Sequence, residues 1–185
     1  MTLQGILLAA GAGTRMGTPK ALVRDEAGEP WLVRGVRALT EGGCDAVTVV
    51  LGAGADEAAP LLDGTTAQVV LATDWADGMS ASLRTGLASL ADGDAESAVV
   101  TLVDLPDVGA DVVRRVTDLG TDRGTLARAS YDGEPGHPVL IGRDHWHGVI
   151  EVAAGDRGAR DYLATHAVFL VECGDLATGA DQDTP

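Results

Sequence analysis

Short apolar runs alternate with longer amphipathic segments along this chain, and that alternation constrains its fold more than any other feature. The run Ala46–Leu51 (AVTVVL) contains almost no polar residue, as expected of a strand that is buried on both faces of a sheet. Before it, Leu32, Val33, Val36 and Leu39 recur at helical spacing. The pattern predicts an α/β fold: one three-layer, Rossmann-like domain with a mostly parallel sheet over all 185 residues.

The same reading predicts the individual elements. We expect strands at Gly5–Ala9, Ala46–Leu51, Gln68–Ala72, Ala98–Val103, Thr125–Ser130, Pro138–Ile141 and Ala167–Glu172. We expect helices at Pro30–Gly42, Asp56–Leu62, Ala110–Leu119, Asp144–Val152 and Ala159–Thr165. A further helix is expected to end near Leu90, with Asp77 or Ser80 as its N-cap. The stretch Tyr131–Gly136 is predicted to be a polar turn.

Charge and cysteine content exclude several classes of protein. The sequence has 28 acidic residues against 13 lysines and arginines, a formal net charge of −15 at pH 7, so neither nucleic acid nor an anionic membrane is expected as a partner. No charged-then-apolar leader and no apolar run of membrane-spanning length is present, so we expect a cytoplasmic protein. Cys44 and Cys173 have no metal-ligand spacing and are expected to be small buried apolar side chains.

The first apolar run ends in a glycine-rich loop that carries two cations. The loop contains Gly11, Gly13 and Gly17 together with Arg15 and Lys20, which is the only lysine of the chain. Glycine allows backbone N–H groups to approach a ligand closely, and successive N–H groups can form a concave anion site. An acidic protein that binds a polyanion needs such a local cationic loop, together with a divalent metal ion. The alternative is an ordinary glycine-rich turn between a strand and a helix.

Two common phosphate-binding motifs do not fit this loop. The dinucleotide fingerprint G-x-G-x-x-G would need its third glycine one residue earlier than Gly17. The Walker motif ends in G-K-[ST], whereas Lys20 lies between Pro19 and Ala21.

Asp104 directly follows the apolar run Ala98–Val103, where a strand is expected to end. Ligands of open α/β sheets bind just beyond the carboxyl ends of the strands, and carboxylate oxygens are ligands that Mg²⁺ prefers. Asp104 is therefore a candidate magnesium ligand. The alternative is that it caps the next helix.

Together these residues resemble a known family. The stretch Leu8–Leu22 (LAAGAGTRMGTPKAL) is similar to the opening motif of the MobA-like nucleotidyltransferases, in which the loop wraps the triphosphate of an incoming NTP. The resemblance implies the fold of nucleotide-diphospho-sugar transferases, with Arg15, Lys20 and Asp104 as catalytic residues. It implies nucleotide contacts from Leu8, Ala9, Ala10, Gly11, Ala12, Gly13, Thr14, Arg15, Lys20, Asp77, Gly78, Ser80 and Ser82.

Other segments resemble the molybdopterin cytidylyltransferase branch of this family. The tail DQDTP (residues 181–185) is similar to the branch's D-[IV]-D-T-P motif, which implies that Asp183 joins Asp104 in holding Mg²⁺. The segments GHPVL (136–140) and GDRGAR (155–160) are similar to motifs on the acceptor side of these enzymes. By that resemblance the acceptor would contact His137, Gly155, Asp156, Gly158 and Arg160.

The resemblance implies a Mg²⁺-dependent transfer of CMP from CTP to the terminal phosphate of molybdopterin, with release of pyrophosphate. Ala10 favours CTP, because the cytidylyl enzymes of the family read L-A-A-G whereas the guanylyl enzymes, which use GTP, read L-A-G-G. A client molybdoenzyme or a chaperone would be a further partner.

Two other functions stay open. The chain also resembles the nicotine blue oxidoreductases, which share this fold and would use NAD(P)H, although the sequence contains no evident flavin or nicotinamide motif. A regulator that binds NTP and Mg²⁺ without turnover is the third interpretation.

Overall fold

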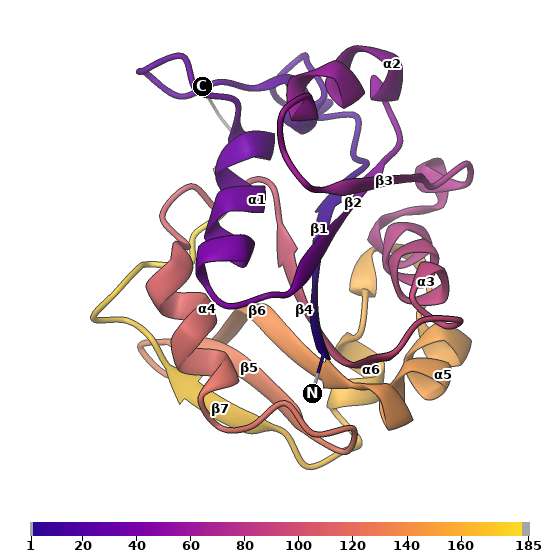
Figure 1. Cartoon of the computed structure of the whole chain (residues 1–185), viewed down its shortest axis with the longest axis vertical. Helices are drawn as coiled ribbons and strands as arrows, with labels where there is room; N and C mark the ends of the chain where they lie inside the picture. The colour runs from indigo at the N-terminus through magenta and orange to yellow at the C-terminus, as the bar shows by residue number, and fades with distance from the viewer. Residues whose placement is uncertain (1, 183–185) are drawn as a thin grey trace.

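Strands β1 (Thr2–Ala9) and β4 (Ala95–Leu102) lie side by side within a seven-stranded sheet in the computed structural model, which describes residues 2–182 (Figure 1). The strand order is β3-β2-β1-β4-β6-β5-β7, and only β6 runs antiparallel to its neighbours among these strands. This sheet confirms the predicted mostly parallel α/β fold. The other strands are β2 (Ala46–Leu51), β3 (Gln68–Leu71), β5 (Leu126–Tyr131), β6 (Glu134–Gly142) and β7 (Phe169–Glu172).

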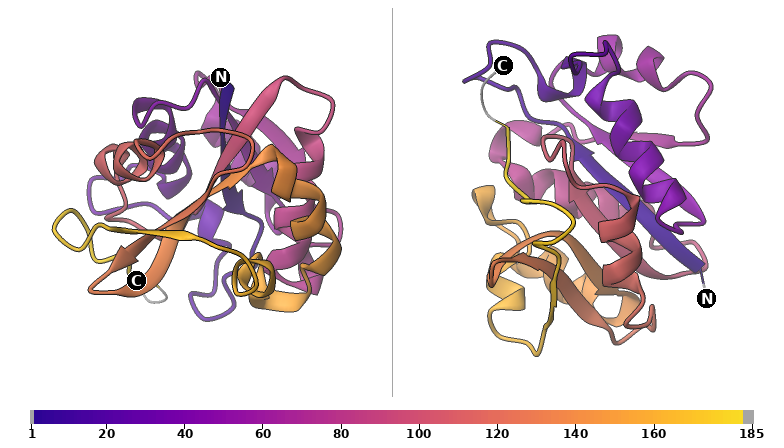
Figure 2. Two further views of the ribbon diagram at one scale, coloured as in Figure 1. Left: turned by 90° about the horizontal axis from the view of Figure 1, so that it is seen from below. Right: turned by 90° about the vertical axis from the view of Figure 1, so that its left-hand side faces the viewer.

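Helices cover both faces of the sheet and make the predicted three layers (Figures 1 and 2). Helices α1 (Trp31–Glu41) and α4 (Ala110–Thr117) pack side by side on one face. The opposite face carries α3 (Met79–Ser89), α5 (Arg143–Val152) and α6 (Arg160–Leu163). Short elements complete the chain: η1 (Lys20–Leu22), α2 (Ala55–Ala58), η2 (Ala59–Leu62), η3 (Trp75–Asp77) and η4 (Gly155–Arg157).

The apolar run of β1 supplies both cores, because successive side chains of a strand point to opposite faces. Leu7 is buried in the core under α1 and α4, whereas Ile6 and Leu8 are buried in the core under α3 and α5. Cys44 and Cys173 are both buried free thiols, and their burial confirms the prediction. Burial raises the pKa of the Cys44 thiol to about 12, which makes it an unreactive apolar group.

The chain leaves β1 and β4 in opposite directions along the sheet. From β1 it proceeds through α1 to β2, and from β4 through α4 toward β5 on the other side. Leu8 pairs with Leu102, so the two strands end at the same level. This is a topological switch point, where open α/β sheets have the crevice that binds ligands.

The β5–β6 hairpin differs from the prediction. The stretch Tyr131–Gly136 is not a polar turn, and the strand expected at residues 138–141 is longer at both ends. Only Asp132 and Gly133 form the turn, with φ of 51° and 83°. Asp-Gly is a favoured pair for such two-residue hairpin turns, because both positions need positive φ. The Asp-Gly dipeptide is a sequence signal for this hairpin that the prediction of a longer polar turn did not use.

The observed boundaries of other elements also differ from the predicted ones. β1 and β4 each begin three residues before the predicted start, because Thr2 pairs with Ala95 and Gln4 with Ala98. Helix α6 is shorter than expected, since only Arg160–Leu163 is α-helical. None of the helices among residues 2–182 is long and apolar enough to span a membrane.

The predicted N-caps of α3 were wrong. Gly78 occupies the N-cap position with a φ of 104°, and the Met79 N–H donates to Asp156 Oδ1 at 3.3 Å instead. A Cβ at Gly78 would lie 2.5 Å from Asp156 Oδ1 and 2.7 Å from the backbone of Gly155. A glycine is needed here because η4 approaches the start of α3 so closely.

We expect Leu140→Ala to lower the free energy of unfolding by about 2–5 kcal/mol, because Leu140 of β6 is fully buried and the truncation leaves a cavity. The matched control is Leu71→Ala on the edge strand β3, where the side chain is 57% exposed and the loss should stay near 0.5 kcal/mol. Urea denaturation followed by circular dichroism measures both, and similar losses would contradict the assignment of the core.

Candidate functional site

A cavity of about 670 Å³ opens at the carboxyl ends of β1 and β4. The loop after β1 forms one side of it, and the start of α3 and the residues after β4 form the others. Every predicted nucleotide-binding residue lines it except Asp77 and Ser80. The lining residues are Leu8, Ala9, Ala10, Gly11, Ala12, Gly13, Thr14, Arg15, Lys20, Trp75, Ala76, Gly78, Met79, Ser82, Leu102, Val103, Asp104, Asp156 and Asp181.

Two of the predicted nucleotide-binding residues, Asp77 and Ser80, lie outside the cavity lining. Asp77 is exposed in η3 and is not part of the cavity lining. Ser80 is fully buried, and its Oγ accepts a hydrogen bond from the Gly158 N–H at 3.0 Å. Because α3 begins at Met79, Ser80 faces the protein interior, whereas Ser82 reaches the cavity.

The glycine-rich loop is held by a turn around Gly13. The Gly13 carbonyl accepts hydrogen bonds from the N–H groups of Met16 and Gly17, both at 2.9 Å. Those two amides are therefore used within the loop. Within the described residues, the amides of Gly11–Thr14 make no hydrogen bond and lie on the cavity wall.

Lys20 and Asp104 meet across the cavity. Lys20 begins η1, which is anchored by the buried Ala21. Its Nζ donates to Asp104 Oδ2 at 2.5 Å, and the two side chains are only 19% and 13% exposed. Asp104 does not cap the following helix, because Gly109 is the N-cap of α4 and no side chain bonds there. The helix-cap alternative for Asp104 is therefore wrong.

The cavity lining carries charges of both signs. Arg15 and Lys20 contribute cations, whereas Asp104, Asp156 and Asp181 contribute carboxylates. This combination suits an anionic ligand that carries a divalent cation, because Mg²⁺ is usually held by one or two carboxylates together with waters and substrate phosphates. Between residues 2 and 182, no three or more His, Cys, Asp or Glu side chains come together as a metal cage.

The C-terminal segment folds back onto the residues that follow β4. Asp107 Oδ2 accepts hydrogen bonds from the N–H and the Oγ1 of Thr178, both at 2.6 Å. The Gln182 N–H then donates to the Asp104 carbonyl at 2.9 Å. These bonds bring Asp181 to the cavity, a residue that the motif comparison had not singled out. The predicted metal ligand Asp183 lies outside the described residues.

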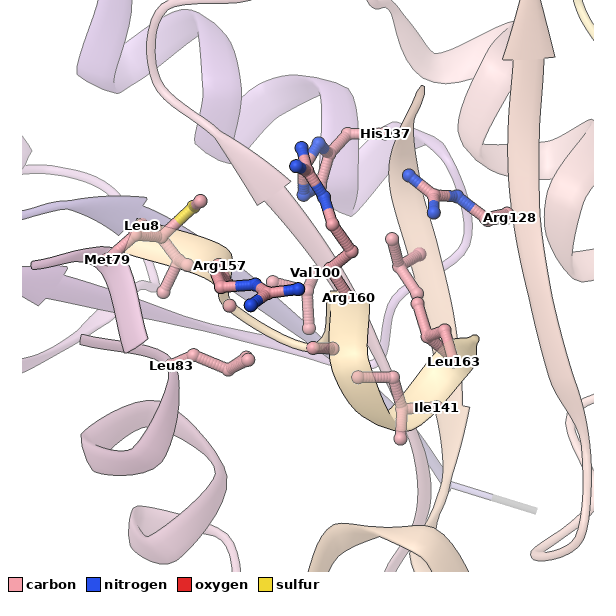
Figure 3. Close-up of a pocket in the computed structure, with 13 residues that line it drawn as sticks. Leu8, Met79, Leu83, Val100, Arg128, His137, Ile141, Arg157, Arg160 and Leu163 are labelled. Carbon is pink, nitrogen blue, oxygen red and sulfur yellow. The ribbon is translucent and has the colours of Figure 1, made fainter. Parts of the chain in front are cut away.

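The predicted acceptor residues do not all share one cavity. His137, Gly158 and Arg160 line a smaller cavity of about 70 Å³, which shares Leu8 and Met79 with the large one (Figure 3). Asp156 lines the large cavity, and Gly155 lines neither. The sequence analysis did not predict Arg128 and Arg157 as site residues, although both line the small cavity.

His137 is a neutral group in this setting. Burial lowers its pKa to about 4, and the nearby Arg128 guanidinium adds to the effect. At neutral pH its imidazole therefore offers hydrogen bonds but no positive charge.

A glycine-rich loop, a lysine and a carboxylate at a topological switch point are features by which α/β proteins can bind phosphate groups. The family of MobA-like NTP transferase domains matches residues 5–169, and the chain belongs to this family of nucleotidyltransferases. The opening motif had predicted the same family, and that prediction is confirmed.

Individual relatives extend the comparison. A protein of Paenarthrobacter nicotinovorans named nicotine blue oxidoreductase is 33% identical to this chain over an alignment of 190 positions. The alignment covers 97% of this chain and 91% of that protein. The structure of Rv0371c from Mycobacterium tuberculosis H37Rv is 26% identical with a TM-score of 0.81, over 100% of this chain and 94% of that one. The nucleotidyl transferase Mth528 from Methanothermobacter thermautotrophicus shares the fold, at 23% identity and a TM-score of 0.76, over 93% of this chain and 87% of that one.

We expect Gly13→Ala to lower the free energy of unfolding by at least about 1 kcal/mol, because Gly13 has a φ of 58° and a Cβ there would lie 1.9 Å from the Thr18 carbonyl oxygen. Hydrogen exchange at the amides of Met16 and Gly17 should become faster. Gly11→Ala is the control, since a Cβ at Gly11 meets no atom within 4 Å. If both variants lost the same stability, the turn around Gly13 would not be what holds the loop.

Proposed function

We propose that this protein transfers CMP from CTP to the terminal phosphate of molybdopterin in a Mg²⁺-dependent reaction that releases pyrophosphate. The observation that carries the proposal is the ion pair between Lys20 and Asp104 across the glycine-rich cavity. Family membership supports an NTP as the first substrate. The choice of CTP and molybdopterin is supported by the motif resemblances, namely Ala10, GHPVL and GDRGAR.

In the proposed reaction, an oxygen of the acceptor's terminal phosphate attacks the α-phosphorus of CTP. The bond between the α-phosphorus and the oxygen that bridges to the β-phosphorus breaks, and its electron pair leaves with pyrophosphate. Such a transfer depends on positioning and charge neutralisation rather than on a proton-transferring side chain. The Gly11–Thr14 amides with Arg15 and Lys20 would neutralise the β- and γ-phosphates, and so stabilise the leaving group.

Asp104 and, by the motif resemblance, Asp183 would hold the magnesium ion. Asp104 fits this role because its carboxylate lies at the end of β4 on the cavity lining, with Oδ2 already oriented by Lys20. Asp181 adds a second carboxylate to the same cavity. When bound, Mg²⁺ supplies a Lewis acid and a template for the phosphate oxygens.

Ala10 supports CTP over GTP only through the resemblance, but its position is fixed. The side chain is buried on the cavity lining, and its carbonyl accepts a hydrogen bond from the Ala53 N–H at 3.0 Å. A Cβ at Gly52 would lie 2.7 Å from that carbonyl oxygen, so Gly52 allows the close approach. A guanylyltransferase that uses GTP is the near alternative on the same site.

The second candidate is an NAD(P)H-dependent oxidoreductase, because the relative from Paenarthrobacter nicotinovorans carries that kind of name. Hydride transfer has no evident use for a lysine paired with a carboxylate beside a glycine-rich loop. The sequence also lacks the dinucleotide fingerprint. We therefore favour the nucleotidyltransferase.

Thermal melting with CTP, GTP, ATP and NADPH, each with and without Mg²⁺, tests the choice, because a ligand that binds only the native state raises the melting temperature. We expect the largest rise with CTP and a requirement for Mg²⁺. A rise with GTP instead would support the guanylyltransferase. A rise with NADPH alone, indifferent to metal, would support the oxidoreductase.

We expect Lys20→Met and Asp104→Asn each to reduce pyrophosphate release by about 100-fold or more, since each removes charge that stabilises the transition state. The assay uses CTP, Mg²⁺ and molybdopterin. Asp94→Asn is the matched control for Asp104→Asn, because Asp94 is exposed just before β4, at the opposite end of that strand. Full activity of Lys20→Met would refute the assignment of the loop. Mg²⁺-dependent CTP binding without any pyrophosphate release would identify a regulator.

A further inference from the structure

Residues 173–182, the C-terminal strap, follow β7 with neither a helix nor a strand (Figure 2). Such a segment has no ladder of its own, so the bonds that it makes to the rest of the chain determine its course. Asp181 of the strap lines the large cavity. The next residue is Gln182, whose N–H donates to the Asp104 carbonyl at 2.9 Å.

The strap is anchored first beside α4 and then on the end of β5. Arg115 of α4 donates through Nη2 to Asp175 Oδ2 at 3.0 Å, and Ala177 is buried in the core under α1 and α4. Gly179 has a φ of 64°, and a Cβ there would lie 2.1 Å from the Tyr131 ring. The strap therefore lies flat on that ring, in a position that needs a glycine.

Asp107 holds the strap between these anchors and the cavity. Its Oδ2 accepts hydrogen bonds from the N–H and the Oγ1 of Thr178, both at 2.6 Å. The same Oγ1 accepts from the Ala180 N–H at 3.3 Å. Hydrogen bonds to a carboxylate are roughly twice as strong as those between neutral groups. Asp107 and Thr178 are both exposed, so their contact can be removed without loss of core packing.

This contact ties together the two segments that carry the carboxylates of the cavity. Asp107 follows Asp104 in the loop after β4, and Thr178 precedes Asp181 in the strap. Asp104 is then held at two places, because Lys20 donates to its side chain and Gln182 donates to its carbonyl. The hold of Asp107 on the strap therefore restricts where the Asp181 carboxylate lies relative to that of Asp104.

We propose that Asp107 is a positioning residue. Through Thr178 it holds the C-terminal strap, so that the carboxylates of the large cavity are set for a divalent cation. Asp107 does not itself line that cavity. Groups that orient metal ligands from outside typically change metal affinity by about tenfold to a hundredfold when they are removed. Cation binding in the cavity rests on the proposed function, whereas the hold of Asp107 on the strap does not.

The probe is Mn²⁺, which suits the same oxygen ligands as Mg²⁺ and is visible by electron paramagnetic resonance. The full chain is titrated with and without saturating CTP. We expect Asp107→Ala to weaken Mn²⁺ binding about tenfold or more and to accelerate hydrogen exchange at the Gln182 amide. Gly179→Ala should have both effects by a different route, because its Cβ displaces the strap from Tyr131.

Thr178→Val keeps the shape of the side chain but removes the hydroxyl, so it should also weaken Mn²⁺ binding. Thr178→Ser restores the hydroxyl and should restore the wild-type affinity. Asp111→Ala is the matched control for Asp107→Ala, because Asp111 is exposed on α4 and pairs with Arg114 of the same helix. It should change neither Mn²⁺ affinity nor exchange at Gln182.

Unchanged exchange at Gln182 in Asp107→Ala would overturn the inference, as would faster exchange with unchanged Mn²⁺ affinity. Absence of Mn²⁺ binding to the wild-type chain, with and without CTP, would also overturn it. If CTP does not bind but Asp107→Ala still weakens the binding of Mn²⁺ alone, the inference stands and the proposed function is refuted.

Discussion

The parallel pairing of β1 with β4 is the contact on which the functional site depends. Leu8 pairs with Leu102, and the Val103 N–H continues the ladder to the Leu8 carbonyl at 3.1 Å. Both strands therefore end together, and the chain leaves them in opposite directions. The loop after β1 and the carboxylate after β4 are separated by more than eighty residues in sequence but share one crevice.

Charge is distributed unevenly over this acidic protein. A net charge of −15 would repel a polyanion, yet the loop after β1 and the small cavity each concentrate cations. In the large cavity, Lys20 is balanced by Asp104 at 2.5 Å, so the site holds both an anion-binding and a cation-binding group. In the small cavity Arg128 and Arg160 meet no carboxylate within the described chain. The two cavities thus differ in what they can bind, although they share two side chains.

Long-range contacts complete the large cavity. The tail after β7 reaches the large cavity through the bonds from Thr178 to Asp107 and from Gln182 to Asp104. Gly78 also allows η4 to pack against the start of α3, and this packing brings Asp156 to the lining of the large cavity. The large cavity is therefore lined by five separate parts of the chain, of which only the first is a continuous motif.

The sequence by itself determined the fold class, nearly all the elements, the family and the glycine-rich loop, because periodicity, turn residues and short motifs are local properties of the chain. It also identified Lys20 and Asp104, although not that they bond to each other. Only the tertiary structure decided that Ser80 faces the interior, that Met16 and Gly17 use their amides within the loop, and that Asp181, Arg128 and Arg157 belong to cavities. These facts depend on strand register, helix starts and the packing of distant segments, and a local pattern of residues does not encode which distant segment will lie beside it.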